Sequence, residues 1–267
     1  MGTYALAIDA PAAAALVSSL TRAGGVVMTA PVLGEESVPA PVKVLLTVAL
    51  ALIALPPGPA WAVAPGAGLP EVAVLLAAEA LIGASLGFAA RAVLSAAAGA
   101  GDLLGFQSGV NVGHVLDPLS GHPSNPLSIL EGSVALQVFL AAGGLGWMAV
   151  ALARSYAAVP PMAGVAPEAL GARIAALGGW VVEGSLLLLA PALIAAVLLD
   201  LLLLTVGRAA PSIQLMVVAL PLKVWVGIAL LAAATYRHAP VLAALMDRVK
   251  NEIEGLLGLM GPVLQVR

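Results

Sequence analysis

Three side chains that can bind a metal ion lie close together in the middle of the chain: His114, Asp117 and His122. Imidazole nitrogen and carboxylate oxygen are common ligands of zinc and iron. A loop rich in Pro and Gly could bring these three side chains together, but no further ligand motif accompanies them. We therefore expect no metal ion and no cofactor.

Nucleophilic chemistry is also weakly supported. Ser133 and Ser185 each follow a glycine, as the serine of an intramembrane protease could, but no G-x-S-x-G elbow is present and His238 has no spacing relation to either serine. The chain has no cysteine, which excludes a thiolate nucleophile, and it has no phosphate-binding P-loop. These residues give little support to an enzyme, and any energy input must come from elsewhere.

The most unusual pattern is a ladder of four glycines spaced four residues apart: Gly101, Gly105, Gly109 and Gly113. In a helix, residues four apart share a face with a drift of roughly 40° per step. Each glycine inside a helix costs about 1 kcal/mol relative to alanine. The ladder therefore indicates either close packing between membrane helices or a segment that is not fully helical.

The residues between these glycines favour a functional interpretation beside the packing one. Several are too polar to face lipid and others are too apolar for a solvated loop; the polar ones are Gln107, Ser108, Asn111, His114 and Asp117, and the apolar ones are Phe106, Val110, Val112 and Val115. A mixed segment of this kind suits the lining or the plug of a passage enclosed by protein.

The composition defines the class of protein that must position these residues. Hydrophobic residues make up 61% of the 267-residue chain and charged residues 9%, against roughly 25% in soluble domains. Aromatic residues make up only 4%, which favours membrane helices over a β-barrel with aromatic girdles. The net charge of −3 provides no basic patch, so we expect no nucleic-acid partner. The sequence predicts an all-α integral membrane protein.

A membrane crossing needs about 20 apolar residues, and six candidate segments meet this criterion. They are residues 10–33, 43–64, 71–98, 129–153, 176–207 and 211–236. Most contain a charge or a proline, and only the run from Gly132 to Ala153 is free of charges with few helix breakers. The charges are too numerous for a simple bundle that faces lipid.

These charges cannot neutralise each other locally. Glu79 and Arg91 are separated by about 18 Å along a helix and by about 120° around it, and Asp200 and Arg208 are nearly as badly placed. Their partners must come from other helices of the chain or from other subunits, and both alternatives stay open.

Composition also divides the chain into parts. We expect a front part over residues 1–160, a linker over 161–175, a helical hairpin over 176–236 that turns near Arg208 to Ser212, and an amphipathic helix over 237–267. This last helix would lie on the membrane surface or dock on a partner. Its positive charges weakly place the C-terminus in the cytoplasm.

Five stretches in order resemble the FliR and SctT family of flagellar and type III export proteins. They are Arg22 with Ala30 to Lys43, Glu79 to Phe88, Gly101 to Pro118, Trp147 to Pro160, and Ala210 to Lys223. The chain departs from the family pattern at Gly143 to Leu145, where the family tends to have Asn-Gly-His, and at Pro211 to Gln214, where it tends to have Pro-Gln-Leu-Asn.

The resemblance implies one subunit of an export gate in the bacterial inner membrane, at the flagellar basal body. Its partners would be FliP, FliQ and FlhB, together with membrane lipid and unfolded proteins in transit. The front part would be FliP-like and the hairpin FliQ-like, giving a fold of kinked helical hairpins. A virulence injectisome subunit of the SctT type is the alternative within the family, and a small-solute channel or secondary transporter is a more remote one.

The resemblance and the residue pattern together define two sets of candidate site residues. Within residues 105–118, the pore plug would comprise Gly105, Phe106, Gln107, Gly109, Val110, Asn111, Val112, Gly113, Asp117 and Pro118. Packing between helices or between subunits would involve Arg22, Glu79, Gly83, Gly87, Arg91, Glu183, Asp200, Arg208, Pro221 and Lys223.

Overall fold

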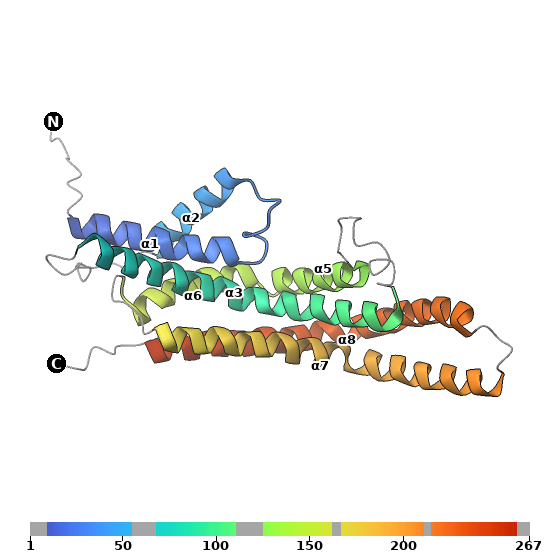
Figure 1. Cartoon of the computed structure of the whole chain (residues 1–267). Coiled ribbons are helices and arrows are strands. Elements are labelled where there is room, and N and C mark those ends of the chain that lie inside the picture. The colour runs from blue at the N-terminus through green and yellow to red at the C-terminus, as the bar shows by residue number, and fades with distance from the viewer. Residues whose placement is uncertain (1–9, 55–67, 111–124, 162–166, 211–214, 261–267) are drawn as a thin grey trace. The chain divides into compact units, whose positions relative to one another are not determined.

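A computed structural model describes residues 10–54, 68–110, 125–161, 167–210 and 215–260, and these residues form helices joined by turns (Figure 1). The helices are α1 (Ala10–Thr29), α2 (Ala40–Ala54), α3 (Leu69–Ser108), α5 (Pro126–Ala141), α6 (Gly144–Ala158), α7 (Pro167–Ala209) and α8 (Leu215–Met260). This architecture confirms the predicted all-α membrane protein.

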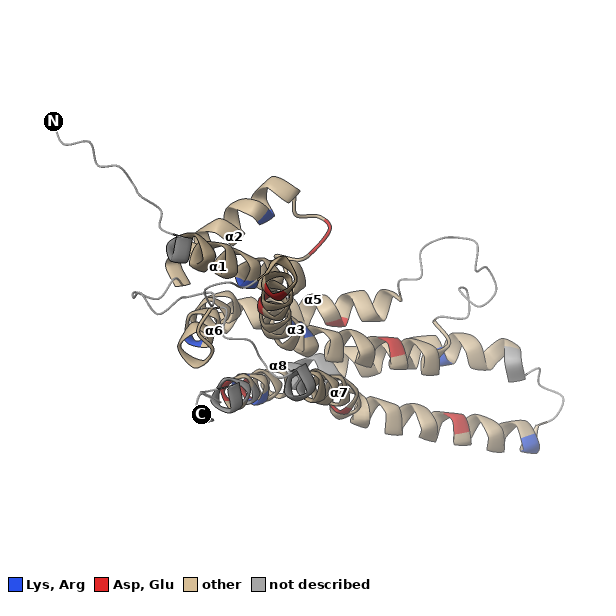
Figure 2. Ribbon diagram, turned by 60° about the vertical axis from the view of Figure 1, so that its left-hand side comes forward, with Lys and Arg blue, Asp and Glu red and all other residues tan. Residues whose placement is uncertain are grey.

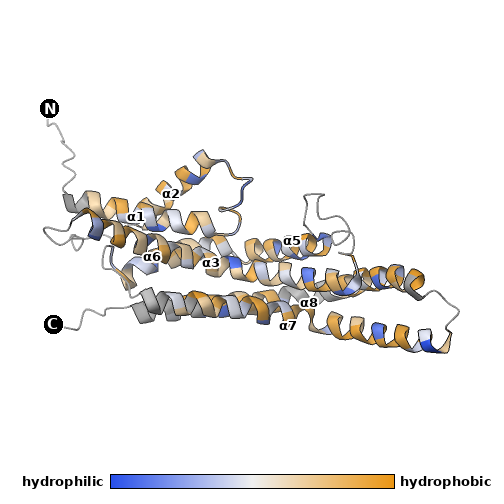
Figure 3. Ribbon diagram, in the orientation of Figure 1, coloured by the Kyte–Doolittle hydropathy of each residue, from blue (hydrophilic) through white to orange (hydrophobic). Residues whose placement is uncertain are grey.

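The helices are long and apolar, with few charges (Figures 2 and 3). Within the described residues, Leu69–Ser108 and Ile174–Ala209 are each long and apolar enough to cross a membrane, and α5 with α6 adds a third crossing if the two form one broken span. Six segments were predicted. The other apolar helical stretches within the described residues are Ala13–Thr29, Ala40–Ala54 and Val217–Ala233, and each described part is shorter than a membrane crossing.

Three predicted boundaries differ from the structure. The run 129–153 is interrupted at Ala142 and Gly143, where Gly143 adopts a left-handed φ of 72°. Helix α7 already begins at Pro167, so much of the predicted linker 161–175 is helical. Helix α8 continues through Pro240, so the predicted separate C-terminal helix belongs to the same helix as residues 215–236.

The described chain forms two compact units. Unit 1 contains Met1–Arg91, Gly143–Leu177 and Arg248–Arg267, and unit 2 contains Ala92–Ala142 and Gly178–Asp247. Each unit therefore combines residues from both the predicted front part and the predicted C-terminal region. The FliP-like and FliQ-like division of the sequence stays a prediction.

In unit 1, α1 packs closely on the first half of α3 through glycines. A Cβ atom at Gly83 would overlap the carbonyl oxygen of Arg22, and one at Gly87 would overlap the Thr29 hydroxyl. Gly25 of α1 lies against the backbone of Ala80 in the same way. Thr29 also donates a hydrogen bond to the Ala84 carbonyl oxygen, 3.0 Å away. The predicted packing role of Gly83 and Gly87 is thus a contact between two helices of this chain.

In unit 2, the second half of α3 lies beside α5, and the hairpin of α7 and α8 packs with them (Figure 1). Ser128 donates to the Ala98 carbonyl oxygen at 3.0 Å, and Ser185 of α7 donates to the Ala96 carbonyl oxygen at 2.9 Å. Ser133 donates to Ile129 of its own helix. Ser133 and Ser185 are therefore hydrogen-bonded to helix backbone, as structural hydroxyls are.

Replacing Gly83 with alanine should lower the stability of the folded chain in detergent, because the added methyl group meets the backbone of α1. The control is Gly178→Ala, since a Cβ atom there meets nothing within 4 Å. That control should keep or raise the melting temperature, because alanine favours helix by about 1 kcal/mol over glycine. Equal melting temperatures for the two variants would show that the close approach at Gly83 is not needed.

Candidate functional site at the end of helix α3 and its buried charges

Two glycines of the ladder, Gly101 and Gly105, lie in the last two turns of α3, and Gly109 directly follows the helix. Gly101 packs against Leu127 and Ser128 at the start of α5, where a Cβ atom would stand 2.5 Å from the Leu127 carbonyl oxygen. Gly105 faces the side chain of Asn125 so closely that a Cβ atom would overlap it. Both glycines therefore serve the helix packing that the sequence predicted as one alternative.

Asn125 connects α5 to the glycine-rich face of α3. Its side-chain oxygen accepts a hydrogen bond from the Leu127 amide at 3.1 Å and so caps the N-terminus of α5. Its side-chain nitrogen donates to the Gly101 carbonyl oxygen at 2.7 Å. Sequence reasoning missed Asn125, although an asparagine directly before a proline at a helix start is a recognisable capping signal.

Gly109 terminates α3. It adopts φ 76°, a left-handed conformation that glycine adopts without steric cost, and its amide bonds the Phe106 carbonyl oxygen at 3.3 Å. Of the predicted plug residues, Gly105 to Val110 thus form the end of a helix and its turn. Asn111, Val112, Gly113, Asp117 and Pro118, together with His114 and His122, lie outside the described residues.

One face of the last turn of α3 contacts α7 and α8, and the opposite face is exposed. Ser108 is buried against Gly227 of α8, where a Cβ atom would lie 2.5 Å from the Ser108 Cβ. Gln107 donates a hydrogen bond from Nε2 to Asp200 Oδ2 of α7 at 2.8 Å. Phe106 points away from this packing and is 76% exposed.

Asp200 also pairs with a cation. The Lys223 ammonium of α8 lies 2.6 Å from Asp200 Oδ1, and both side chains are half-buried. Pro221, one half-turn earlier in α8, is exposed, as is Arg208 at the end of α7. The partner of Asp200 is therefore a lysine on the neighbouring helix.

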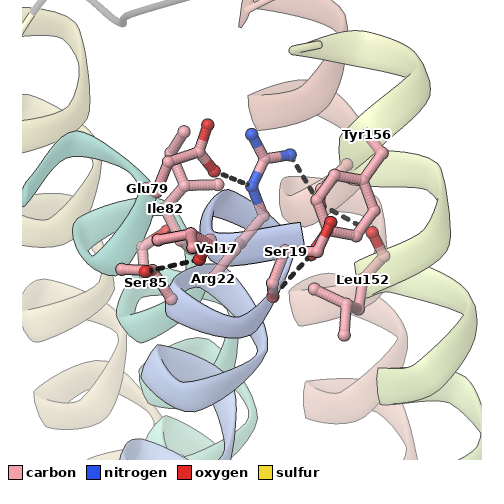
Figure 4. A network of polar contacts seen from close by, with 10 residues as sticks. Val17, Ser19, Arg22, Glu79, Ile82, Ser85, Leu152 and Tyr156 are labelled. Atoms are coloured by element: carbon pink, nitrogen blue, oxygen red, sulfur yellow. Dashed lines mark hydrogen bonds and ion pairs between the residues drawn. The ribbon is translucent and has the colours of Figure 1, made fainter. Parts of the chain in front are cut away.

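A second charge cluster lies in the core of unit 1 (Figure 4). The guanidinium of Arg22 on α1 donates from Nε to Glu79 Oε2 of α3 at 2.6 Å, and both side chains are at most 2% exposed. It also donates from Nη1 to the Ser155 hydroxyl at 3.1 Å and lies 4.4 Å from the ring centre of Tyr156. Tyr156 in turn donates its hydroxyl hydrogen to the Ser19 carbonyl oxygen at 3.1 Å.

This cluster joins three helices through one buried arginine. A guanidinium has fixed donor directions, so its contacts hold α1, α3 and α6 in one arrangement. Burying a charge is costly unless it is paired and hydrogen-bonded; Arg22 is paired through Nε and hydrogen-bonded through Nη1, while its buried Nη2 has no hydrogen-bond partner among the described residues. The geometry of the cluster indicates a structural centre.

Two further predicted packing charges, Arg91 and Glu183, also interact within the chain. Arg91 donates to Glu35 at 2.7 Å in an exposed ion pair, and Glu183, exposed on α7, takes part in an interaction as well. Glu79 and Asp200 thus pair with residues of other helices, as predicted, whereas the partner of Arg91 lies in the turn between α1 and α2. Among the described residues, no group of three or more His, Cys, Asp or Glu side chains could hold a metal ion.

Comparison with known proteins gives one consistent result. Residues 13–249 match the family model described as bacterial export proteins, family 1. The flagellar biosynthetic protein FliR of Escherichia coli K12 is 29% identical over 249 residues, which cover 89% of each chain. The proteins of the same name from Pectobacterium carotovorum and Caulobacter vibrioides are 28% and 25% identical, and each alignment covers at least 86% of both chains.

Replacing Arg22 with methionine should lower the free energy of unfolding by roughly 3–5 kcal/mol, because Glu79 would keep a buried charge without its cation. The control is Arg91→Met, which breaks an exposed pair and should cost about 0–1 kcal/mol. Denaturant unfolding of both variants in detergent measures the difference. Equal losses would mean that burial of the Arg22 pair carries no special stability.

Proposed function

The chain belongs to family 1 of the bacterial export proteins, and from this membership we propose that it is a structural component of a flagellar protein export apparatus. The names of its relatives favour the flagellar system over an injectisome. Its long apolar helices suit a place in the bacterial inner membrane, at the flagellar basal body. Energy for transport would come from other components of the apparatus.

In this proposal the chain assembles with FliP and FliQ into a gate and contacts FlhB. The observation that supports assembly is the large apolar surface that the chain leaves exposed. On α2, Leu45 and Ile53 are 68% and 79% exposed, and on α8 Trp225 is 72% exposed. Faces of this kind need lipid or the helices of companion subunits to cover them.

The gate segment would be residues 105–118, which plug the closed pore. The single observation that carries this assignment is the end of α3: a helix terminus packed on one face, open at Phe106, and terminated by a left-handed Gly109. Such an end holds the start of the segment in place while glycine lets the chain after it change direction without steric cost. Unfolded export substrates would pass when this segment moves aside.

Deleting Gly109 to Val112 should make the assembled gate leak small ions, because the shortened segment no longer fills the pore. The variant is co-expressed with FliP and FliQ from the same organism, purified as a complex, and placed in a planar bilayer. Recovery of the three subunits in the parental ratio serves as the folding control. Conductance as low as that of the parent complex would reject the plug assignment, and failure of the parent chain to co-purify with FliP and FliQ would reject the gate itself.

A further inference from the structure

Asp200 stands at the meeting point of three helices in unit 2. One of its carboxylate oxygens accepts from Gln107 of α3 at 2.8 Å, and the other lies 2.6 Å from the Lys223 ammonium of α8. The helix that carries Asp200 is a candidate membrane span, and the residues beside it in the sequence are leucines. A lone carboxylate in such a helix is costly, so Lys223 neutralises Asp200 and Gln107 satisfies its second oxygen.

The contact with Gln107 is different in kind from the contact with Lys223. The ion pair joins α7 to α8, which already form a hairpin, whereas the Gln107 hydrogen bond joins that hairpin to the last turn of α3. Gln107 is followed two residues later by Gly109, where the helix ends. This hydrogen bond thus ties the last turn of α3 to α7, two residues before the helix ends at Gly109.

A second contact joins the last turn of α3 to the α7–α8 hairpin. Lys223 and Gly227 are four residues apart on α8 and so share a face of that helix. Gly227 meets Ser108, which is 3% exposed, and Lys223 reaches Gln107 through Asp200. Adjacent residues of α3 therefore contact one face of the hairpin, one by close packing and one by a polar bridge.

We propose that Gln107 is a positioning residue for the gate segment: its hydrogen bond to the paired carboxylate of Asp200 holds the end of α3 on the α7–α8 hairpin and thereby fixes where the segment after Gly109 begins. This inference rests on the proposed function of residues 105–118. It adds one specific requirement to that function. When the gate segment is displaced, the hydrogen bond between Gln107 and Asp200 must break, or the two residues must move together.

The ion pair makes such a release feasible in a membrane. Because Lys223 keeps Asp200 neutralised, Gln107 can leave without exposing an unpaired charge to the apolar surroundings. The amide of Gln107 is itself uncharged. The two contacts therefore have separate roles. Lys223 neutralises the charge of the carboxylate, and the hydrogen bond from Gln107 holds the end of α3 against it.

The test uses the absence of cysteine from the chain. A single Val110→Cys substitution next to Gly109 reports the accessibility of the segment through its rate of reaction with a water-soluble maleimide in the assembled complex. Into this background we introduce Gln107→Leu, which removes the donor at similar size. Its matched control is Gln137→Leu, the same change at an exposed glutamine of α5 in the same unit.

Gln107→Leu should raise the labelling rate about tenfold or more, the factor expected when a hydrogen bond to a charged group is lost, and it should raise the conductance of the complex. Gln137→Leu should change neither.

The outcomes separate this inference from the function on which it rests. If deletion of Gly109 to Val112 opens the gate but Gln107→Leu labels and conducts like the parent, Gln107 does not position the segment and the plug assignment stands. If Gln107→Leu speeds labelling while neither it nor the deletion conducts ions, the attachment is real and the plug assignment falls. Equal effects of the Gln107→Leu and Gln137→Leu substitutions overturn the inference.

Discussion

A charge inside an apolar helix must be neutralised within the protein, and the described structure depends on this constraint. The chain has few charges, yet it places Arg22, Glu79, Asp200 and Lys223 in helices rich in alanine, leucine and valine. Each pairs with a residue from a different helix of the same compact unit, at 2.6 Å. Because a lone charge in lipid costs roughly 2.5–3.5 kcal/mol or more, a wrong pairing of helices is strongly disfavoured. The ion pairs therefore specify which helices meet, and apolar packing stabilises the contacts once they form.

Glycine provides the complementary constraint, because it determines how closely those helices meet. Gly83 allows the backbone of α1 to lie against α3 near Arg22, and Gly105 and Gly227 allow the end of α3 to approach Asn125 and α8. Where a polar contact and a close glycine contact lie side by side, the helix has no freedom to slide. This combination recurs at the Arg22 cluster and at the end of α3, so the helix end at the start of the proposed plug is built on the same principle as the core of unit 1.

Much of this could be predicted from the sequence, since the helical class, the end of α7 near Arg208 and the need of Glu79 and Asp200 for partners on other helices follow from composition and spacing. The pairings could not be predicted, because Arg22 and Glu79 are 57 residues apart and an apolar helix has no polar face to indicate which side is buried. The break at Gly143 and the passage of α8 through Pro240 were missed for a related reason. A glycine or proline shifts a local preference by only about 1–3 kcal/mol, and tertiary packing decides whether the helix bends, ends or continues. At the candidate site, Gln107 and Asp200 were both selected, while their contact depends on a fold that brings residues 93 positions apart together.

The most direct test of the account is a charge exchange between Asp200 and Lys223. The chain carrying Asp200→Lys alone places two cations together between α7 and α8, and the account predicts loss of protease-resistant, membrane-inserted protein. Adding Lys223→Asp restores an ion pair of reversed polarity, and the account predicts recovery of most of that protein. If the double variant is as poorly folded as the single one, or if the single reversal has no effect, the two charges are not each other's partners and the central claim is wrong.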